Sequence, residues 1–276
     1  MKRIGRQFKE EILVVLRDCR RALCLALLVI CASPAIGQEE ELADLDGPEL
    51  AGGGENASNP LASVTNTDLR LQYLDLADDL GRVNDLFVDG AFMVNPKLKI
   101  KYELHYWETN VTGTSQSGLE TAVLKTIYFP KQGVLDNGTK YKVAIGLDLI
   151  VDFGNHDKGI GLGADQVGPF VGIALSMPSG LTLIPLVQQF LSVSGKDVNI
   201  TAARVIALQP LTKQRLLKAD LIVPYDWETA TIPAQAELQF GVNVNQQVAL
   251  YVDGLVGLGH ERIFDWGIGV GLRIKY

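Results

Sequence analysis

Beyond residue 31 the chain has no cysteine, because Cys19, Cys24 and Cys31 all lie near its N-terminus. The rest of the chain therefore has no disulfide framework, no thiolate metal site and no thiol nucleophile. Histidine is nearly as scarce. His105, His156 and His260 stand on separate segments, without the close spacing of a metal site. We expect neither a metal nor a cofactor.

Long apolar runs are also missing, since a membrane-spanning helix needs about 20 such residues. The apolar run 22–32 is too short, and it follows seven basic residues. The small residues Ala35 and Gly37 end this stretch, which is typical of a signal peptide cleaved after Gly37. A membrane anchor would need a longer run, and a lipid-modified Cys31 would follow a smaller residue than Ile30. We interpret residues 1–37 as a signal peptide.

An excess of basic charge is absent as well. Residues 38–276 hold 18 basic and 29 acidic side chains, and the segment 38–66 has seven acids, no base and a Gly-Gly-Gly run. This composition predicts that residues 38–66 form a disordered acidic periplasmic tail. The remaining 67–276 is nearly balanced and carries no basic stripe, which argues against a nucleic-acid partner.

Helical periodicity is almost absent from residues 67–276, and alternation replaces it. In the last twelve residues the apolar set is Trp266, Ile268, Val270, Leu272, Ile274 and Tyr276, whereas the other set is Asp265, three glycines, Arg273 and Lys275. Ten steps of about 3.3 Å, tilted by about 40°, rise roughly 25 Å. That height matches the apolar band of an outer-membrane barrel, with an aromatic residue at each interface.

Similar segments recur along the chain. The candidate strands are 67–75, 85–95, 97–108, 118–128, 140–151, 165–176, 180–192, 198–208, 214–226, 233–243, 247–256 and 265–276. Short and longer connections alternate between them, except for a long turn at 129–139 and a short loop at 194–197. An even strand number with such alternation is typical of bacterial barrels. We expect an all-β, transmembrane, antiparallel up-and-down β-barrel of about 12 strands (67–276) in the outer membrane. A soluble sandwich is the alternative.

The aromatic residues support the expectation of a barrel, whereas three prolines argue against it. The predicted membrane-interface aromatics are Tyr106, Trp107, Tyr225, Trp266 and Tyr276. A terminal aromatic such as Tyr276 resembles the signal read by the barrel-assembly machinery, which we expect as a partner besides the lipid bilayer. Pro169, Pro185 and Pro224 fall within candidate strands, although a closed barrel has no free edge for them.

The charged residues on the inward sets are candidates for lining the lumen. They are Lys101, Glu103, Asp148, Arg204, Lys218, Asp220, Glu237, Asp253 and Arg273. They could form a mutually paired structural network or a selectivity ring for a polar solute. Asp220 and Glu237 lie on neighbouring strands. If they share a layer, a cation must compensate them or they must share a proton.

Five segments resemble a known family: 59–62 (Asn-Pro-Leu-Ala), 95–98 (Asn-Pro-Lys-Leu), 101–107, 159–169 and 265–273. Through them, most of 59–276 is similar to outer-membrane proteins of the MetA-pathway-of-phenol-degradation type. The resemblance implies an outer-membrane barrel that passes small, often aromatic, molecules. It supplies no binding residues for this chain.

Catalytic motifs are missing from the sequence. A barrel phospholipase needs His, Ser and Asn together on the barrel wall, and none of the three histidines stands in such a context. The sequence therefore predicts that the chain is not an enzyme. We expect a channel or facilitator for small molecules, including aromatic or hydrophobic ones. A non-conducting structural or ligand-binding barrel is the alternative.

Overall fold

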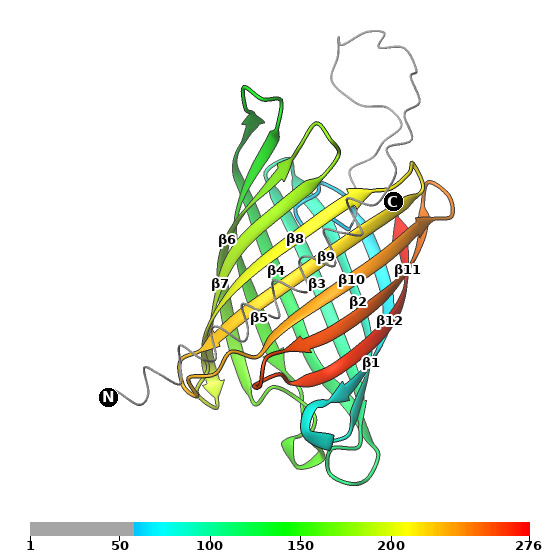
Figure 1. The fold of residues 1–276 in the computed structure, drawn as a ribbon. Helices are drawn as coiled ribbons and strands as arrows, with labels where there is room; N and C mark the ends of the chain where they lie inside the picture. The colour runs from blue at the N-terminus through cyan, green and yellow to red at the C-terminus, as the bar shows by residue number, and fades with distance from the viewer. Residues whose placement is uncertain (1–57) are drawn as a thin grey trace.

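The computed structural model describes residues 58–276. The predicted signal peptide and the predicted tail as far as residue 57 lie outside the described residues. Twelve strands form one closed barrel in which each strand pairs antiparallel with its neighbours in the chain, and β1 pairs with β12 (Figure 1). The predicted fold class is therefore confirmed.

The strands follow one another with short connections. Their bounds are β1 (Asn66–Leu76), β2 (Arg82–Asn95), β3 (Leu98–Thr109), β4 (Gln116–Val134), β5 (Lys140–Asp152), β6 (Ala164–Ser176), β7 (Thr182–Gly195), β8 (Asn199–Pro210), β9 (Arg215–Asp226), β10 (Ala234–Asn243), β11 (Val248–Leu258) and β12 (Phe264–Lys275). Two single 3-10 turns, η1 (Ala77–Asp79) and η2 (His156–Lys158), lie in the connections after β1 and β5. Within residues 58–276 the structure has no helix with the length and apolar character needed to cross a membrane.

The exterior of the barrel is apolar. On β3, Tyr102, Leu104 and Tyr106 point outward and are exposed, and so are Ile268 and Val270 on β12. Exposed leucine, isoleucine, valine and aromatic side chains occur in the same outward positions on most other strands. A water-soluble protein would bury such a surface, whereas hydrocarbon solvates it.

The two ends of the barrel differ. We call the end that carries the C-terminus the inner end and the opposite end the outer end (Figure 1). The prediction of a long turn over 129–139 at the inner end is wrong, because β4 continues to Val134. A register shift between Tyr128 and Lys131 places Pro130 in a bulge, where its missing N–H interrupts no regular ladder.

The three prolines within strands are accommodated in a common way. Pro169 pairs with Leu147 of β5, and both Pro185 and Pro224 pair with residues of β8. On the other side of each proline the regular pairing is interrupted or has already ended. A proline has no N–H to donate, so a one-sided ladder is the arrangement it can support.

Candidate functional site

The interior of the barrel is lined by charged side chains that bind one another. All nine predicted lumen-lining residues lie on this inward face: Lys101, Glu103, Asp148, Arg204, Lys218, Asp220, Glu237, Asp253 and Arg273. They come from β3, β5 and the run of strands from β8 to β12. Closing the sheet brings them together although they are far apart in sequence.

Asp220 and Glu237 do share a layer, because they are direct partners in the β9–β10 ladder. Arg204 donates from Nε and Nη2 to the two Asp220 oxygens at 2.9 and 2.6 Å. Lys218 Nζ lies 3.2 Å from Asp220 Oδ2 and 2.9 Å from Glu237 Oε1. Cations therefore compensate both carboxylates, the first of the two arrangements expected from the sequence.

Arg70 on β1 ties two further strands, β10 and β11, to its own. Its Nη2 lies 2.6 Å from Asp253 Oδ2 and 3.2 Å from Glu237 Oε2, and its guanidinium stacks 5.4 Å from the Tyr251 ring centroid. The Tyr251 ring can lie here because β12 presents Gly271. A Cβ at that position would come within 2.1 Å of the ring. Gly271 of β12 thus provides space for an aromatic ring.

A second group of polar side chains lines the wall formed by β2 to β7. Lys125 Nζ lies 3.0 Å from Asp148 Oδ2, and Gln188 Nε2 donates to the same oxygen at 2.8 Å. Toward β2, His105 Nδ1 lies 2.8 Å from Asp85 Oδ2. Lys101 and Glu103 are more loosely paired, with Nζ and Oε1 3.8 Å apart.

The lumen keeps some access to solvent between these two walls. The side chain of Arg204 is 31% exposed and that of Glu103 is 25% exposed, whereas the side chains of Asp220 and Asp253 are nearly or fully buried. Arg204 lies on β8 and Glu103 on β3, which are five strands apart around the closed barrel. The arrangement therefore offers positively charged hydrogen-bond donors and negatively charged hydrogen-bond acceptors across one polar space.

Several buried polar atoms in the lumen have no hydrogen-bond partner within residues 58–276. They are Asp85 Oδ1, Trp107 Nε1, Glu120 Oε1 and Asp148 Oδ1. Asp85 and Trp107 are direct partners in the β2–β3 ladder. Buried polar atoms of this kind are normally satisfied by water or by a solute. Among the same residues, no group of His, Cys, Asp or Glu is arranged to hold a metal ion.

Trp107 differs from its predicted position at the membrane interface. It follows Tyr106 directly on a regular strand, and neighbouring residues of a strand point to opposite faces. Tyr106 is exposed on the outside and donates to Ser117 Oγ at 3.0 Å, so Trp107 points into the barrel. Trp266 and Tyr276 are exposed, and Tyr225 lies edge-on to Trp227 with ring centroids 4.7 Å apart.

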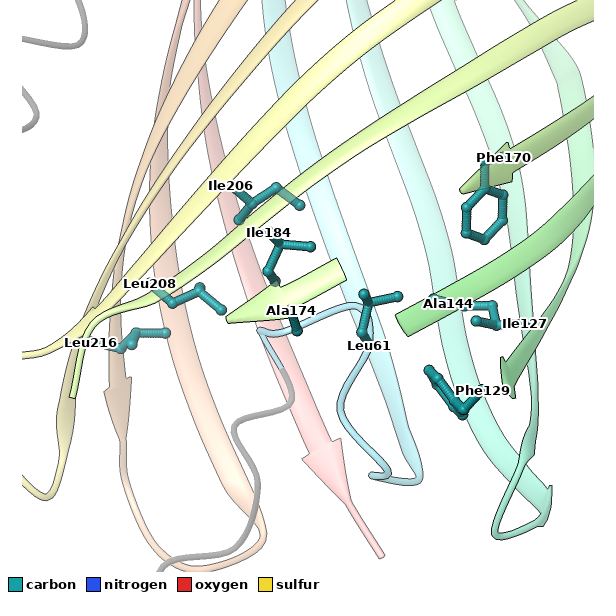
Figure 2. Packing of buried hydrophobic residues seen from close by; sticks show 10 residues of the cluster. All are labelled: Leu61, Ile127, Phe129, Ala144, Phe170, Ala174, Ile184, Ile206, Leu208 and Leu216. Carbon is teal, nitrogen blue, oxygen red and sulfur yellow. The ribbon is translucent and has the colours of Figure 1, made fainter. Parts of the chain in front are cut away.

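The inner end of the lumen is filled by residues 58–63, which we call the plug segment. Its Leu61 is 2% exposed and lies among inward-facing apolar side chains of β4 to β9 (Figure 2). We call this set of side chains the apolar collar; it comprises Ile127, Phe129, Ala144, Phe170, Ala174, Ile184, Ile206, Leu208 and Leu216. The plug segment belongs to the predicted tail 38–66, whose last residue, Asn66, already begins β1.

Three basic side chains hold the plug segment. Lys99 Nζ donates to the carbonyl oxygens of Pro60 at 3.2 Å and Ala62 at 2.6 Å. Lys142 Nζ donates to Ser63 Oγ at 2.6 Å, and Arg273 donates to Ser58 Oγ. Beside Ser58 and Arg273 a cavity of about 20 Å³ remains, which has room for a single water molecule.

Sequence reasoning missed several of these residues, although some carried a signal. Asp68 and Arg70 alternate with Leu69 and Leu71, so the inward face of β1 was readable. The inward position of Lys125 could not be predicted from alternation. A register shift in the β3–β4 ladder near Leu104 exchanges the inward and outward positions along β4. The plug segment has no periodicity, and nothing in its sequence indicated a place inside the barrel.

Neither the protein-family models nor the curated proteins contain a match to this chain. The solved structures do. The NanC porin matches with a TM-score of 0.59 at 9% identity, over 76% of this chain and 100% of its own. An outer membrane channel from Pseudomonas putida F1 matches with a TM-score of 0.60 at 7% identity, over 78% and 96%. The KdgM porin matches with a TM-score of 0.52 at 9% identity, over 76% and 99%.

Outer membrane phospholipase A from Escherichia coli is also among the matches, with a TM-score of 0.48 at 13% identity over 76% of this chain and 92% of its own. So distant a match assigns no activity to this chain. It does correct the prediction that the chain is not an enzyme, because barrels of this general architecture include enzymes.

The comparisons agree on the type of barrel. The closed twelve-stranded fold is shared with outer-membrane porins and channels, and its exterior is the apolar surface that a bilayer requires. The predicted outer-membrane location is thereby confirmed, and the chain is a twelve-stranded outer-membrane β-barrel.

Proposed function

We propose that this barrel is an outer-membrane channel for small molecules. The observation that carries the proposal is the partly exposed set of charges on facing walls of the lumen, with Arg204 opposite Glu103. A barrel that served only as a membrane anchor would gain nothing from keeping ionised side chains accessible in its interior. A solute path needs such groups, because they replace part of the hydration of a polar solute.

The order of the surfaces along the lumen supports one class of solute. A polar section with both signs of charge is followed at the inner end by the apolar collar. Small molecules with an apolar or aromatic part and a polar group suit both sections. The resemblance of segments 59–62 and 95–98 to barrels proposed to pass aromatic molecules supports the same class.

Two measurements on purified protein test this function. In planar bilayers we expect discrete conductance steps, and in liposomes we expect uptake of a neutral phenolic solute faster than uptake of a disaccharide. Liposomes without protein and liposomes with protein denatured before reconstitution are the controls. Folded protein that shows neither conductance nor uptake would reject the channel.

A non-conducting structural or ligand-binding barrel is the second candidate. Its support is the completeness of the pairing, since Asp220, Glu237 and Asp253 all bind cations from the same wall. Such a network could simply fill the lumen. This candidate predicts that solute uptake stays at the background level even when the plug segment is displaced.

A further inference from the structure

We propose that the inner end of the barrel is a binding site for the chain's own plug segment, and that this contact is a gate which closes the lumen from the inner side. The gate rests on the proposed channel function, whereas the docking contact does not. The occupant is residues 59–62, the Asn-Pro-Leu-Ala sequence that precedes β1.

The apolar part of this site is the apolar collar, which the plug segment covers. Six consecutive strands, β4 to β9, contribute buried apolar side chains to one cluster around Leu61. Ile184 and Ile206 are completely buried although they point into the lumen. Side chains that face a water-filled channel would be wetted, so the collar is dry because Leu61 and its neighbours cover it (Figure 2).

The polar part of the site recognises backbone. Lys99 is 2% exposed, and its Nζ binds the carbonyl oxygens of Pro60 and Ala62. Contacts from one ammonium to two carbonyls of one short turn fix the segment in a single position. Lys142 and Arg273 bind the serines at its two ends. The plug segment is therefore held at both ends as well as through Leu61.

The plug segment arrives with its shape already formed. Asn59 Oδ1 accepts from the Leu61 N–H at 2.8 Å, and the Asn59 carbonyl accepts from the Ala62 N–H at 3.0 Å. With Pro60 at the next position, this is an Asx-type turn that forms locally. A preformed turn loses little conformational freedom on docking, which favours a specific and reversible contact.

The contact can open without disturbing the barrel. Residues 58–65 belong to no strand, and the twelve-stranded ladder closes through β1 and β12 without them. Withdrawal of the plug segment would expose the collar and join the polar lumen to the inner side. A segment that can leave its site without breaking the hydrogen bonds of any strand is suited to gating.

The first experiment tests docking alone. The mature chain has no native cysteine, so Leu61→Cys and Val134→Cys, which is exposed at the same end, can each be labelled with a membrane-impermeant maleimide. In proteoliposomes with the inner end accessible, we expect Leu61→Cys to react slower by on the order of tenfold or more. Equal labelling rates would overturn the proposal whatever the conductance.

The second experiment tests the gate. Leu61→Asp should raise conductance and solute uptake several-fold, because the carboxylate cannot stay in the collar. Leu135→Asp, which changes an exposed leucine of a turn at the same end, should leave both unchanged. A bismaleimide bridge between Ser63→Cys and Lys142→Cys, whose native side chains meet at 2.6 Å, should lower conductance below the unbridged level.

The outcomes separate the two proposals. Conductance that is already high in the wild type and unaffected by Leu61→Asp or by the bridge would reject the gate and keep the channel. If the Leu61→Asp variant is folded by gel mobility and its plug segment is displaced, yet it never conducts, both the channel and the gate are rejected. In that case the docking contact alone would stand.

Discussion

At the scale of single residues, Arg70 connects several strands in the interior of the barrel. It reaches from β1 to Asp253 of β11 and Glu237 of β10, between the rings of Phe87 and Tyr251. The Asp253 side chain is fully buried, so its charge depends on this partner and on Gln239. Buried charges that lose a partner are costly, whereas paired ones contribute modestly.

We therefore expect Arg70→Met to lower the free energy of unfolding by about 3–5 kcal/mol, the usual cost of breaking a buried ion pair. Unfolding in urea, followed by the loss of the fast-migrating gel band, measures the change. Arg215→Gln removes an exposed guanidinium at the start of β9 and should change stability by less than about 0.5 kcal/mol. If Arg70→Met were as stable as Arg215→Gln, the interior network would contribute little.

The second residue-scale prediction concerns ion preference. Asp220 and Glu237 neutralise Arg204 and Lys218, so the double substitution Asp220→Asn with Glu237→Gln leaves these two cations uncompensated. Fixed positive charge in a narrow passage favours anions. We expect a weak cation preference in the wild type and its loss or reversal in the variant, read as reversal potential in a salt gradient. An unchanged reversal potential would place these side chains outside the conducting path.

At the scale of elements, the alternation of β12 is the clearest case in which sequence and structure agree. Trp266, Ile268 and Val270 are exposed on the outside, as their period-two spacing predicts. The same reasoning suggests that Gly269→Ser, a change on the inward face, should be harmless. The structure shows otherwise, because a Cβ on Gly269 would lie 2.8 Å from Asp253 Oδ2.

Val270→Arg tests the outward face of this strand. Val270 is 54% exposed in the middle of β12, and arginine near the midplane of a bilayer costs roughly 2–4 kcal/mol on the outside of a barrel. We expect impaired folding into lipid vesicles but near-normal folding into detergent micelles, measured by gel mobility. Val270→Leu is the matched control. Equal folding of both variants into vesicles would show that β12 does not face lipid.

Tyr276 directly follows β12, which ends at Lys275. Its side chain is 74% exposed, and its N–H donates to the Thr65 carbonyl at 3.1 Å. Deletion of Tyr276 removes one backbone hydrogen bond and little packing, so refolding in detergent should be nearly unchanged. Assembly in cells should fall if a terminal aromatic is read by the assembly machinery. Comparison of the two yields checks the prediction, and an equal loss in both would indicate a packing role.

Strands could be predicted because a lipid-facing strand must keep one face apolar over its whole length, as β3 and β12 do. Which residues face inward could not be predicted where a bulge shifts the alternation by one residue. This happens at the register shift opposite Leu104 and at the bulge around Pro130. Interior pairings such as Arg70 with Asp253 depend on contacts between strands far apart in sequence. Spacing along the chain contains no such information, and the docked turn at Leu61 was invisible for the same reason.

At the scale of the whole molecule, the closed ladder determines how the protein should behave on a gel. A barrel in which every strand is paired on both sides resists detergent until it is heated. We expect the protein to fractionate with outer membranes and to migrate faster unheated than boiled. Recovery as a soluble periplasmic protein, or one mobility at all temperatures, would contradict the barrel in the membrane.

The plug segment is joined to β1 by residues 64 and 65 alone, which sets its effective concentration at the inner mouth. A tether this short holds a ligand at roughly millimolar local concentration or above. Docking is then unimolecular, so its equilibrium is independent of how many barrels the membrane holds. A free peptide of the same sequence at micromolar concentration would compete poorly, whereas a force applied to the preceding acidic segment would act on the plug directly.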